Sequence, residues 1–270
     1  MDLKISKVNE VFMKISCDDS IAKDLHDFFS FKVPNAKFMP SYKNRRWDGK
    51  VYLFSIKTHK IYIGLLPYIA DFCEERKYTY EVESDVVKKN VITEDELLKF
   101  IEDLHLPFEP RDYQLEAFKK SIDYGRKLLV SPTASGKSLI IYLLARYYNK
   151  KTVIIVPTTS LVEQMSKDFE EYGYEEPICK IYSGQKVFDA PITITTWQSL
   201  SKAPIDVLQS FDVVVGDEAH LFKANVLKGI LEKMRNTAIR FGTTGTLDGT
   251  EVHRLQLEGL FGPATKVIST

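Results

Sequence analysis

The segment SPTASGKS, residues 131–138, has the residue types of a loop that binds phosphate. The full pattern is G-x-x-x-x-G-K-[ST], and Ser131 stands where the first glycine is expected. In such a loop Lys137 would contact the β- and γ-phosphates, and the hydroxyl of Ser138 would be a ligand of Mg²⁺. Because Ser131 falls at the strand end, before the turn around the phosphate, we expect phosphate binding to persist. The predicted nucleotide contacts in this segment are Thr133, Ser135, Gly136, Lys137 and Ser138.

A second motif, DEAH at residues 217–220, follows the apolar run FDVVVG. At the C-terminal edge of a parallel strand, Asp217 can hold Mg²⁺, and Glu218 can orient and deprotonate an attacking water. Alone, the first motif could be an incidental turn and the second an acidic helix cap. Together, in this order and about eighty residues apart, they predict a site that hydrolyses a nucleoside triphosphate. Its predicted catalytic residues are Lys137, Asp217, Glu218 and His220.

A parallel sheet would bring these two motifs together, and the chain from Arg111 onward has the corresponding pattern. Continuous apolar runs alternate with helical segments, which indicates a parallel sheet covered on both faces. The predicted strands are 126–131, 152–157, 191–196, 211–217 and 238–244, and the predicted helices are 138–148, 160–172 and 225–234. We therefore predict an α/β lobe with a mostly parallel sheet over residues 111–270.

The first 86 residues have a different pattern, in which short strands and helices form a small α+β domain. The predicted strands are 3–6, 11–16, 60–64 and 78–83, and the predicted helices are 20–31 and 65–77. Asp18 or Asp19 can cap the first helix. Asp48-Gly49, within RRWDGKVYLF, is a two-residue hairpin signal. Residues 87–110 are predicted to connect the two domains through an acidic helix that begins near Glu94.

The charges are unevenly distributed, although 37 Lys and Arg balance 37 Asp and Glu. From Lys37 to Lys60 there are seven Lys or Arg and one acid, Asp48. Cations bind phosphates and exposed aromatic rings can stack on bases, whereas alternation along a hairpin can bury the rings in a small core. Beside a nucleotide-driven site, we predict that this stretch binds nucleic acid. Its predicted contacts are Arg45, Arg46, Trp47 and Lys50.

The cysteines and the hydropathy point to a reducing, aqueous compartment. Cys17, Cys73 and Cys179 lie far apart, which predicts neither a disulfide framework nor a zinc site. The start, MDLKISKVNE, is too polar for a signal peptide. The densest apolar run, SLIIYLLA, spans eight residues and is too short to cross a bilayer. We expect a soluble protein of the cytoplasm.

The combination of SGKS and DEAH resembles superfamily 2 helicases, and further segments match the motifs of that family in the expected order. The resemblance implies that Arg111 and Gln114 of RDYQ contact adenine. It also implies that Thr244 and Thr246 of GTTGTL couple hydrolysis to lobe movement. The segments IIVPTTSLVEQ and ITTWQSL are implied to contact a nucleic-acid strand. The matching residues there are Thr158, Gln164 and Thr196.

Over its whole length, through LHDFFSF, RRWDGKVYLF and LLARYY, the chain resembles UvsW-like superfamily 2 DNA helicases of T-even-like bacteriophages. The resemblance implies a RecA-like lobe that uses ATP and Mg²⁺. It implies an ATP-dependent DNA helicase or translocase of recombination and replication, located in the cytoplasm of the host. Branched DNA and R-loops are the implied substrates, and strand annealing is an implied second activity.

Little sequence follows the last of these motifs. Helicases of this class close the ATP site between two RecA-like lobes, and the second lobe supplies an arginine finger. After Leu247 only 23 residues remain, with one arginine, Arg254. We therefore expect a monomer that needs a second lobe, in cis or from a partner. Alone, the chain is expected to bind ATP-Mg²⁺ weakly and nucleic acid moderately, and to unwind little or nothing.

Other functions share part of this pattern. An ATP-regulated clamp would bind nucleic acid without separating strands. An RNA helicase or a restriction-type translocase would have the same core motifs. A P-loop kinase would transfer phosphate to a small molecule and would not respond to DNA, but the DEAH box and the threonine-rich strand ends disfavour it.

Overall fold

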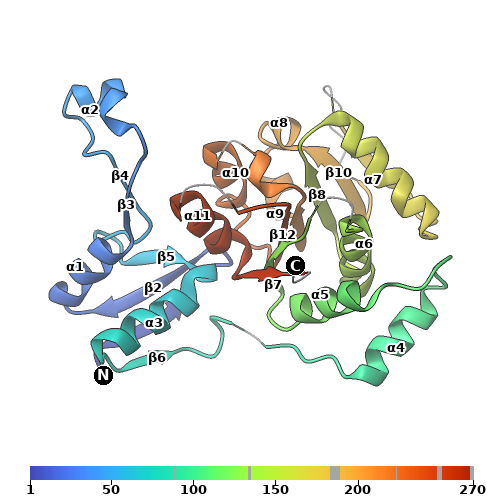
Figure 1. Cartoon of the computed structure of the whole chain (residues 1–270), viewed down its shortest axis with the longest axis horizontal. Helices are drawn as coiled ribbons and strands as arrows, with labels where there is room; N and C mark the ends of the chain where they lie inside the picture. Colours follow the sequence, from blue (N-terminus) through green and yellow to red (C-terminus); the bar gives the residue numbers. More distant parts are fainter. Residues whose placement is uncertain (88, 133–134, 183–188, 223, 248–250, 268–270) are drawn as a thin grey trace.

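Seven parallel strands form the large sheet of the computed structural model, which describes residues 1–87, 89–132, 135–182, 189–222, 224–247 and 251–267. Their order across the sheet is β13-β7-β12-β11-β8-β10-β9, and every neighbouring pair is parallel (Figure 1). The strands are β7 (Arg126–Val130), β8 (Thr152–Val156), β9 (Ile178–Ile181), β10 (Ile192–Thr196), β11 (Val213–Gly216), β12 (Ile239–Thr244) and β13 (Ala264–Lys266). The predicted α/β lobe with a parallel sheet is confirmed.

Alternate residues of the central strands point into two hydrophobic cores, one on each face of this sheet. On β8, Ile154 belongs to one core, and its neighbours Val153 and Ile155 belong to the other. Helices α5 (Asp112–Ile122), α6 (Lys137–Tyr148) and α7 (Thr159–Glu171) cover the first face. Helices α8 (Trp197–Leu200), α9 (Ile205–Gln209), α10 (Ala224–Leu231) and α11 (Glu251–Phe261) cover the second. Burial on both faces explains why these strands are continuous apolar runs.

The N-terminal part forms a smaller sheet of the order β5-β2-β1-β6. β1 pairs with β2 in antiparallel and with β6 in parallel orientation. The strands are β1 (Leu3–Lys7), β2 (Phe12–Cys17), β5 (Lys60–Tyr62) and β6 (Tyr80–Val82), and the helices are α1 (Asp19–Phe28) and α3 (Leu66–Arg76). Asp18 is the N-cap residue of α1, although its side chain makes no capping hydrogen bond. The predicted small α+β domain is therefore present.

Residues 30–52 form an arm that projects from this domain (Figure 1). The arm consists of the paired strands β3 (Ser30–Lys32) and β4 (Lys50–Tyr52), with η1 (Ala36–Phe38) and α2 (Pro40–Lys43) between them. The predicted two-residue hairpin at Asp48-Gly49 is wrong, because β4 pairs with the distant β3. Gly49 instead adopts a positive φ of 81° just before β4, where its carbonyl accepts from the N–H of Val33 at 2.8 Å.

The small domain and the lobe share one hydrophobic core. Buried residues of β1, β2, α1 and α3 belong to the same cluster as those of α10 and α11. At the contact, η2 (Ile63–Leu65) lies against α11, and its central residue, Gly64, has no room for a side chain. A Cβ atom on Gly64 would lie 2.0 Å from the Glu258 carbonyl oxygen, and one on Gly259 would lie 2.8 Å from the ring of Tyr62. Only glycine permits this approach of the two backbones.

The connector contains the predicted acidic helix, α4 (Glu94–Asp103), which begins at a capping box formed by Thr93 and Glu96. The α4 helix packs on the lobe through a stacked pair of rings, Phe100 and Phe118, with centroids 5.5 Å apart. The domain boundaries at residues 86 and 110 stay predictions. Within the described ranges, none of the helices combines the length and the apolar character that a membrane span requires.

Candidate nucleotide site and nucleic-acid surfaces

The phosphate-loop candidate lies between β7 and α6, at the C-terminal edge of the large sheet. Ser131 is fully buried, and its N–H donates to the Thr244 carbonyl at 2.9 Å. The Ser135 hydroxyl donates to the Pro132 carbonyl at 2.7 Å, so the Ser131 hydroxyl is the donor in its bond to Ser135 Oγ. The serine at the first position therefore ties the two ends of the loop together. Thr133 lies outside the described residues.

Gly136 is the other residue that the loop geometry requires. It has a φ of 73°, and a Cβ atom there would lie 2.3 Å from Gln114 Nε2. Gln114 is buried, and its amide donates to the carbonyls of Ser135 and Gly136, each at 3.3 Å. Tyr113 donates to the Ser135 carbonyl at 3.0 Å, and Arg111 donates to the Tyr113 hydroxyl at 2.9 Å. These residues of α5 and its N-cap thus support the loop backbone. The implied adenine contacts of Arg111 and Gln114 stay predictions.

Lys137 and Glu218 bring the two sequence motifs into direct contact. Lys137 Nζ lies 2.8 Å from Glu218 Oε1, and it also donates to the Ser131 carbonyl at 3.3 Å. Glu218 has a left-handed backbone with a φ of 51°, and its Oε2 accepts from the Gly245 N–H at 3.2 Å. The carboxylate therefore lies between the cation of the phosphate loop and the backbone of the GTTGTL segment.

Asp217 is 6% exposed and follows β11 directly. Its Oδ1 accepts a hydrogen bond from the Thr243 hydroxyl at 2.5 Å. Burial raises the pKa of the Asp217 carboxyl, whereas the hydrogen bond from Thr243 opposes that increase. Thr243 is not among the residues that the sequence motifs predicted. Because Gly216 and Gly242 are partners in the β11–β12 register, the next residues along both strands lie side by side.

His220 and the threonines of the GTTGTL segment form a second polar group beside Glu218. The Thr244 hydroxyl donates to the Thr246 carbonyl at 2.7 Å. It must therefore accept from His220 Nδ1, which lies 2.8 Å away. His220 Nδ1 is also 3.4 Å from Glu218 Oε2. The acidic motif and the predicted coupling residues thus contact one another, whereas their catalytic and coupling roles stay predictions.

The residues suit a hydrated or phosphate-bound Mg²⁺ better than a metal held by protein ligands alone. No group of three or more His, Cys, Asp or Glu side chains with metal-binding geometry occurs in the described part of the chain. Asp217 and Ser138 offer hard oxygen ligands, and a Mg²⁺ site with one or two protein oxygens plus phosphate oxygens is the usual arrangement. Ser138 Oγ lies 2.8 Å from the hydroxyl of Tyr172, the residue that follows α7. Tyr172 is therefore a neighbour of the predicted Mg²⁺ ligand that the sequence motifs did not indicate.

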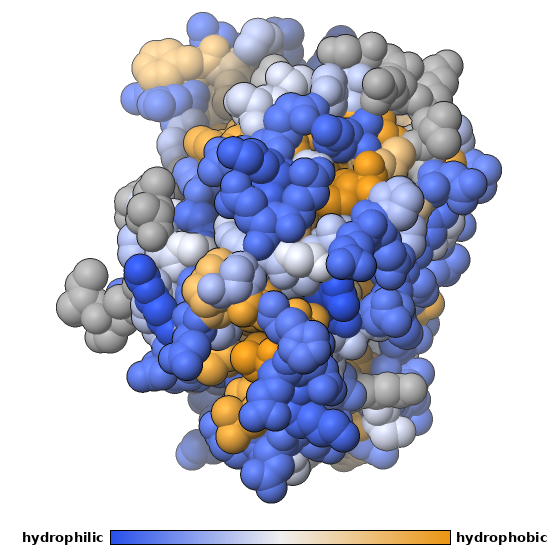
Figure 2. Space-filling view, turned by 90° about the vertical axis from the view of Figure 1, so that its right-hand side faces the viewer, coloured by the Kyte–Doolittle hydropathy of each residue, from blue (hydrophilic) through white to orange (hydrophobic). Residues whose placement is uncertain are grey.

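Of the predicted strand-contacting residues, Thr158 follows β8 and Thr196 ends β10, at the same edge of the sheet. Thr158 is exposed and caps α7 by accepting from the Leu161 N–H at 3.4 Å. Gln164 is exposed on α7. Thr196 is buried and caps α8, so its hydroxyl is engaged with Ser199. The face that carries α4 and α7 is mostly hydrophilic (Figure 2).

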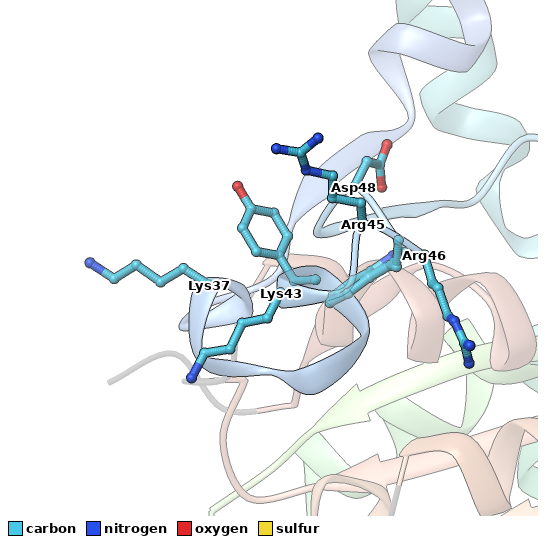
Figure 3. Close-up of a pocket in the computed structure, with 7 residues that line it drawn as sticks. Lys37, Lys43, Arg45, Arg46 and Asp48 are labelled. Carbon is cyan, nitrogen blue, oxygen red and sulfur yellow. The ribbon is translucent and has the colours of Figure 1, made fainter.

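The basic residues gather on the arm around a hollow of about 590 Å³ (Figure 3). Arg45 and Arg46 are exposed, whereas Lys50 is half-buried. Trp47 is also half-buried, and its indole donates to the Lys50 carbonyl at 2.7 Å. The tryptophan therefore braces the turn that leads into β4, and its predicted contact with nucleic acid stays a prediction.

Comparison with known proteins places this geometry in a family. Residues 107–249 match the family described as the res subunit of type III restriction enzymes, and residues 2–83 match the N-terminal region of the DNA helicase UvsW. The chain belongs to the first of these families. Its sequence-based resemblance to UvsW-like superfamily 2 helicases, with a RecA-like lobe, is confirmed.

Helicase proteins of bacteriophage T4 match this chain over nearly its whole length. The ATP-dependent DNA helicase uvsW of enterobacteria phage T4 is 31% identical over 286 residues, which cover 100% of this chain and 57% of the relative. A crystal structure of the UvsW helicase from bacteriophage T4 matches with a TM-score of 0.91, 31% identity and coverage of 98% of this chain and 100% of that one. A second T4 UvsW structure matches with a TM-score of 0.92 and 31% identity, and the match covers 100% of this chain and 57% of that one. The chain thus spans 57% of the length of the T4 helicase sequence.

Proposed function

We propose that this chain is the ATP-binding and DNA-binding part of an ATP-dependent helicase or translocase that acts on branched DNA or R-loops. The observation that carries the proposal is the 2.8 Å contact between Lys137 and Glu218, which joins the phosphate-loop and acidic motifs in one site. The likeness to the T4 ATP-dependent DNA helicase supports the choice of nucleotide and of nucleic acid. The location is expected to be the cytoplasm, that of the host if a phage encodes the chain.

In this proposal Lys137 binds the terminal phosphates of ATP and gives up its contact with Glu218 when they arrive. Glu218, held by the Gly245 N–H, then accepts a proton from the water that attacks the γ-phosphorus. The bond between that water and phosphorus forms as the bond from the γ-phosphorus to ADP breaks. Asp217 and Ser138 would hold Mg²⁺, which when bound neutralises negative charge on the phosphate oxygens.

Thr244 and His220 provide the proposed path from the nucleotide to the rest of the lobe. His220 Nδ1 donates to the Thr244 hydroxyl at 2.8 Å and also lies 3.4 Å from Glu218 Oε2, so the three side chains meet at this one nitrogen. A change in the position of Glu218 on ATP binding would shift the backbone at Gly245, just after β12. The chain continues from there to α11, which packs on the small domain that carries the basic arm.

The experiment is ATP hydrolysis by this chain, and by the chain joined to a second helicase lobe, each with and without branched DNA. We expect turnover and DNA stimulation only with the second lobe, and their loss in the Lys137→Ala variant. If neither protein hydrolyses ATP while both bind DNA, the chain is an ATP-regulated clamp. If RNA stimulates turnover and branched DNA does not, it belongs to an RNA helicase.

A further inference from the structure

Two apolar side chains lie at the tip of the arm, and nothing in the fold accounts for their exposure. Phe38 is 63% exposed and Met39 is 41% exposed. Tyr42, on the adjoining turn of α2, is also 41% exposed. By contrast, Phe29 and Phe54, which lie close to the base of the arm in sequence, are fully buried. The apolar character of the tip is therefore available to a partner.

The backbone of the tip is fixed although its side chains are exposed. The N–H of Phe38 donates to the Asn35 carbonyl at 3.0 Å, and the N–H of Met39 donates to the Ala36 carbonyl at 2.9 Å. Asn35 has a positive φ of 59°, which starts the turn. The side chains of Phe38 and Met39 are thus presented on a defined turn, so binding through them would not require the loop to fold first.

Cations surround this apolar tip. The arm carries Lys32, Lys37, Lys43, Arg45, Arg46 and Lys50. Its one acid, Asp48, is engaged with the Tyr52 hydroxyl and the Lys50 N–H. The ammonium group of Lys37 lies 5.2 Å from the centroid of the Phe38 ring. An apolar ring with cations on its borders is complementary to a base flanked by phosphates.

We propose that Phe38, supported by Met39, stacks on a base at a DNA branch point while the cations of the arm hold the adjoining phosphates. This inference rests on the proposed function and specifies its substrate. Inside a continuous duplex both faces of every base pair are covered by neighbouring pairs. A base at a fork or junction leaves one face uncovered, so the Phe38 ring distinguishes branched from continuous DNA, whereas the cations do not.

The test is DNA binding by the whole chain without ATP. A forked duplex is compared with a covalently closed circular duplex, which has no branch, no end and no unpaired loop. Phe38→Ala is expected to weaken binding of the fork roughly 5- to 150-fold, the equivalent of one lost stacking contact. Binding of the closed duplex should stay unchanged. The slope of log Kd against log salt concentration should also stay the same for both, because Phe38 neutralises no phosphate.

Three further variants make this result specific. Arg46→Ala should weaken the binding of both DNAs and reduce the slope of log Kd against log salt concentration by about one unit. Phe38→Trp should retain the preference for the fork, because a ring remains. Leu98→Ala removes another exposed apolar side chain, 53% exposed on α4, and should change the binding of neither DNA. A 2-aminopurine base at the branch should change its fluorescence with the wild-type chain and not with Phe38→Ala.

The inference and the proposed function fail separately. Loss of ATP hydrolysis would leave these ATP-independent measurements intact. Equal losses on both DNAs in Phe38→Ala, or no loss on either, would overturn the stacking role. Binding to vesicles of anionic phospholipid by the wild-type chain but not by Phe38→Ala, with unchanged binding to the fork, would assign the tip to a membrane surface instead.

Discussion

Lys137 Nζ and Glu218 Oε1 form an ion pair at 2.8 Å, and both side chains are largely buried. The pair joins the residue predicted to bind phosphate with the residue predicted to activate water. Each charge therefore has a partner when the site contains no phosphate. Because an unpaired buried charge is costly, removing either partner alone would destabilise the site. ATP must consequently compete with Glu218 for Lys137.

Glu218→Gln separates binding from hydrolysis. The variant loses the competing negative charge, so we expect it to bind ATP several-fold more tightly than the wild-type chain. Without a base, hydrolysis in the presence of a second lobe should fall about 10²- to 10⁴-fold. A fluorescent ATP analogue measures affinity, and phosphate release measures turnover. Glu171→Gln, on the exposed end of α7, is the control and should alter neither. Weaker ATP binding in Glu218→Gln would contradict competition within the pair.

Ser131→Ala tests the bond that closes the phosphate loop. The buried Ser131 hydroxyl bonds to Ser135 Oγ, so its removal should lower the free energy of unfolding by about 1 kcal/mol. ATP affinity should stay within about threefold, because Gly136, Lys137 and Ser138 are unchanged. Urea unfolding and nucleotide titration measure the two effects. Ser201→Ala, an exposed hydroxyl that bonds to its own turn, serves as the control. A much larger loss of ATP affinity would mean that the hydroxyl itself shapes the phosphate site.

The sequence was sufficient to predict the elements that depend on local pattern. The strands around Ile154 and Val214 are apolar runs because both their faces are buried. Helix α11 was missed for the same physical reason. It is packed between the sheet and the small domain, so buried residues such as Leu255, Leu257 and Leu260 surround it rather than forming one stripe. Strands β9 and β13, at the two edges of the sheet, were also missed, because most of their residues are only partly buried and neither strand is a continuous apolar run.

The site shows the same division between local and long-range information. The meeting of Lys137 with the acidic motif follows from the rule that carboxyl ends of parallel strands share one edge. The support of the loop by Gln114 depends on how α5 docks, which no local pattern specifies. The hairpin signal at Asp48-Gly49 misled for this reason too, since the partner of β4 lies in the distant segment β3.

Gly64→Ala tests the contact between the small domain and the lobe. The added methyl group would lie 2.0 Å from the Glu258 carbonyl oxygen, a backbone atom that cannot rotate away. We expect a loss of about 3 kcal/mol or more in the free energy of unfolding, because overpacking against backbone is among the costlier core changes. Gly229→Ala is a matched control. Gly229 lies within α10 with nothing within 4 Å of an added Cβ, so alanine there should stabilise the chain by about 0.5–1 kcal/mol. Equal effects of the two substitutions would show that the domains are not packed as closely as described.

Asp217→Asn tests the electrostatic cost of the predicted Mg²⁺ ligand. Burial raises the pKa of this carboxyl above its usual 3.8, so the folded chain binds the proton more tightly than the unfolded chain. The stability that this bound proton contributes is fully present below about pH 3.8, the pKa of the carboxyl in the unfolded chain. It is lost as the pH rises through the pKa of the folded chain. Asparagine removes this loss, so the variant should be more stable than the wild-type chain at pH 7, with a smaller difference at pH 4. Urea unfolding at pH 4 and at pH 7 measures the difference in the free energy of unfolding. Asp212→Asn, at an exposed position, is the control. Lower stability of Asp217→Asn at pH 7 would mean that the hydrogen bond from Thr243 to the charged carboxylate outweighs the cost of burial.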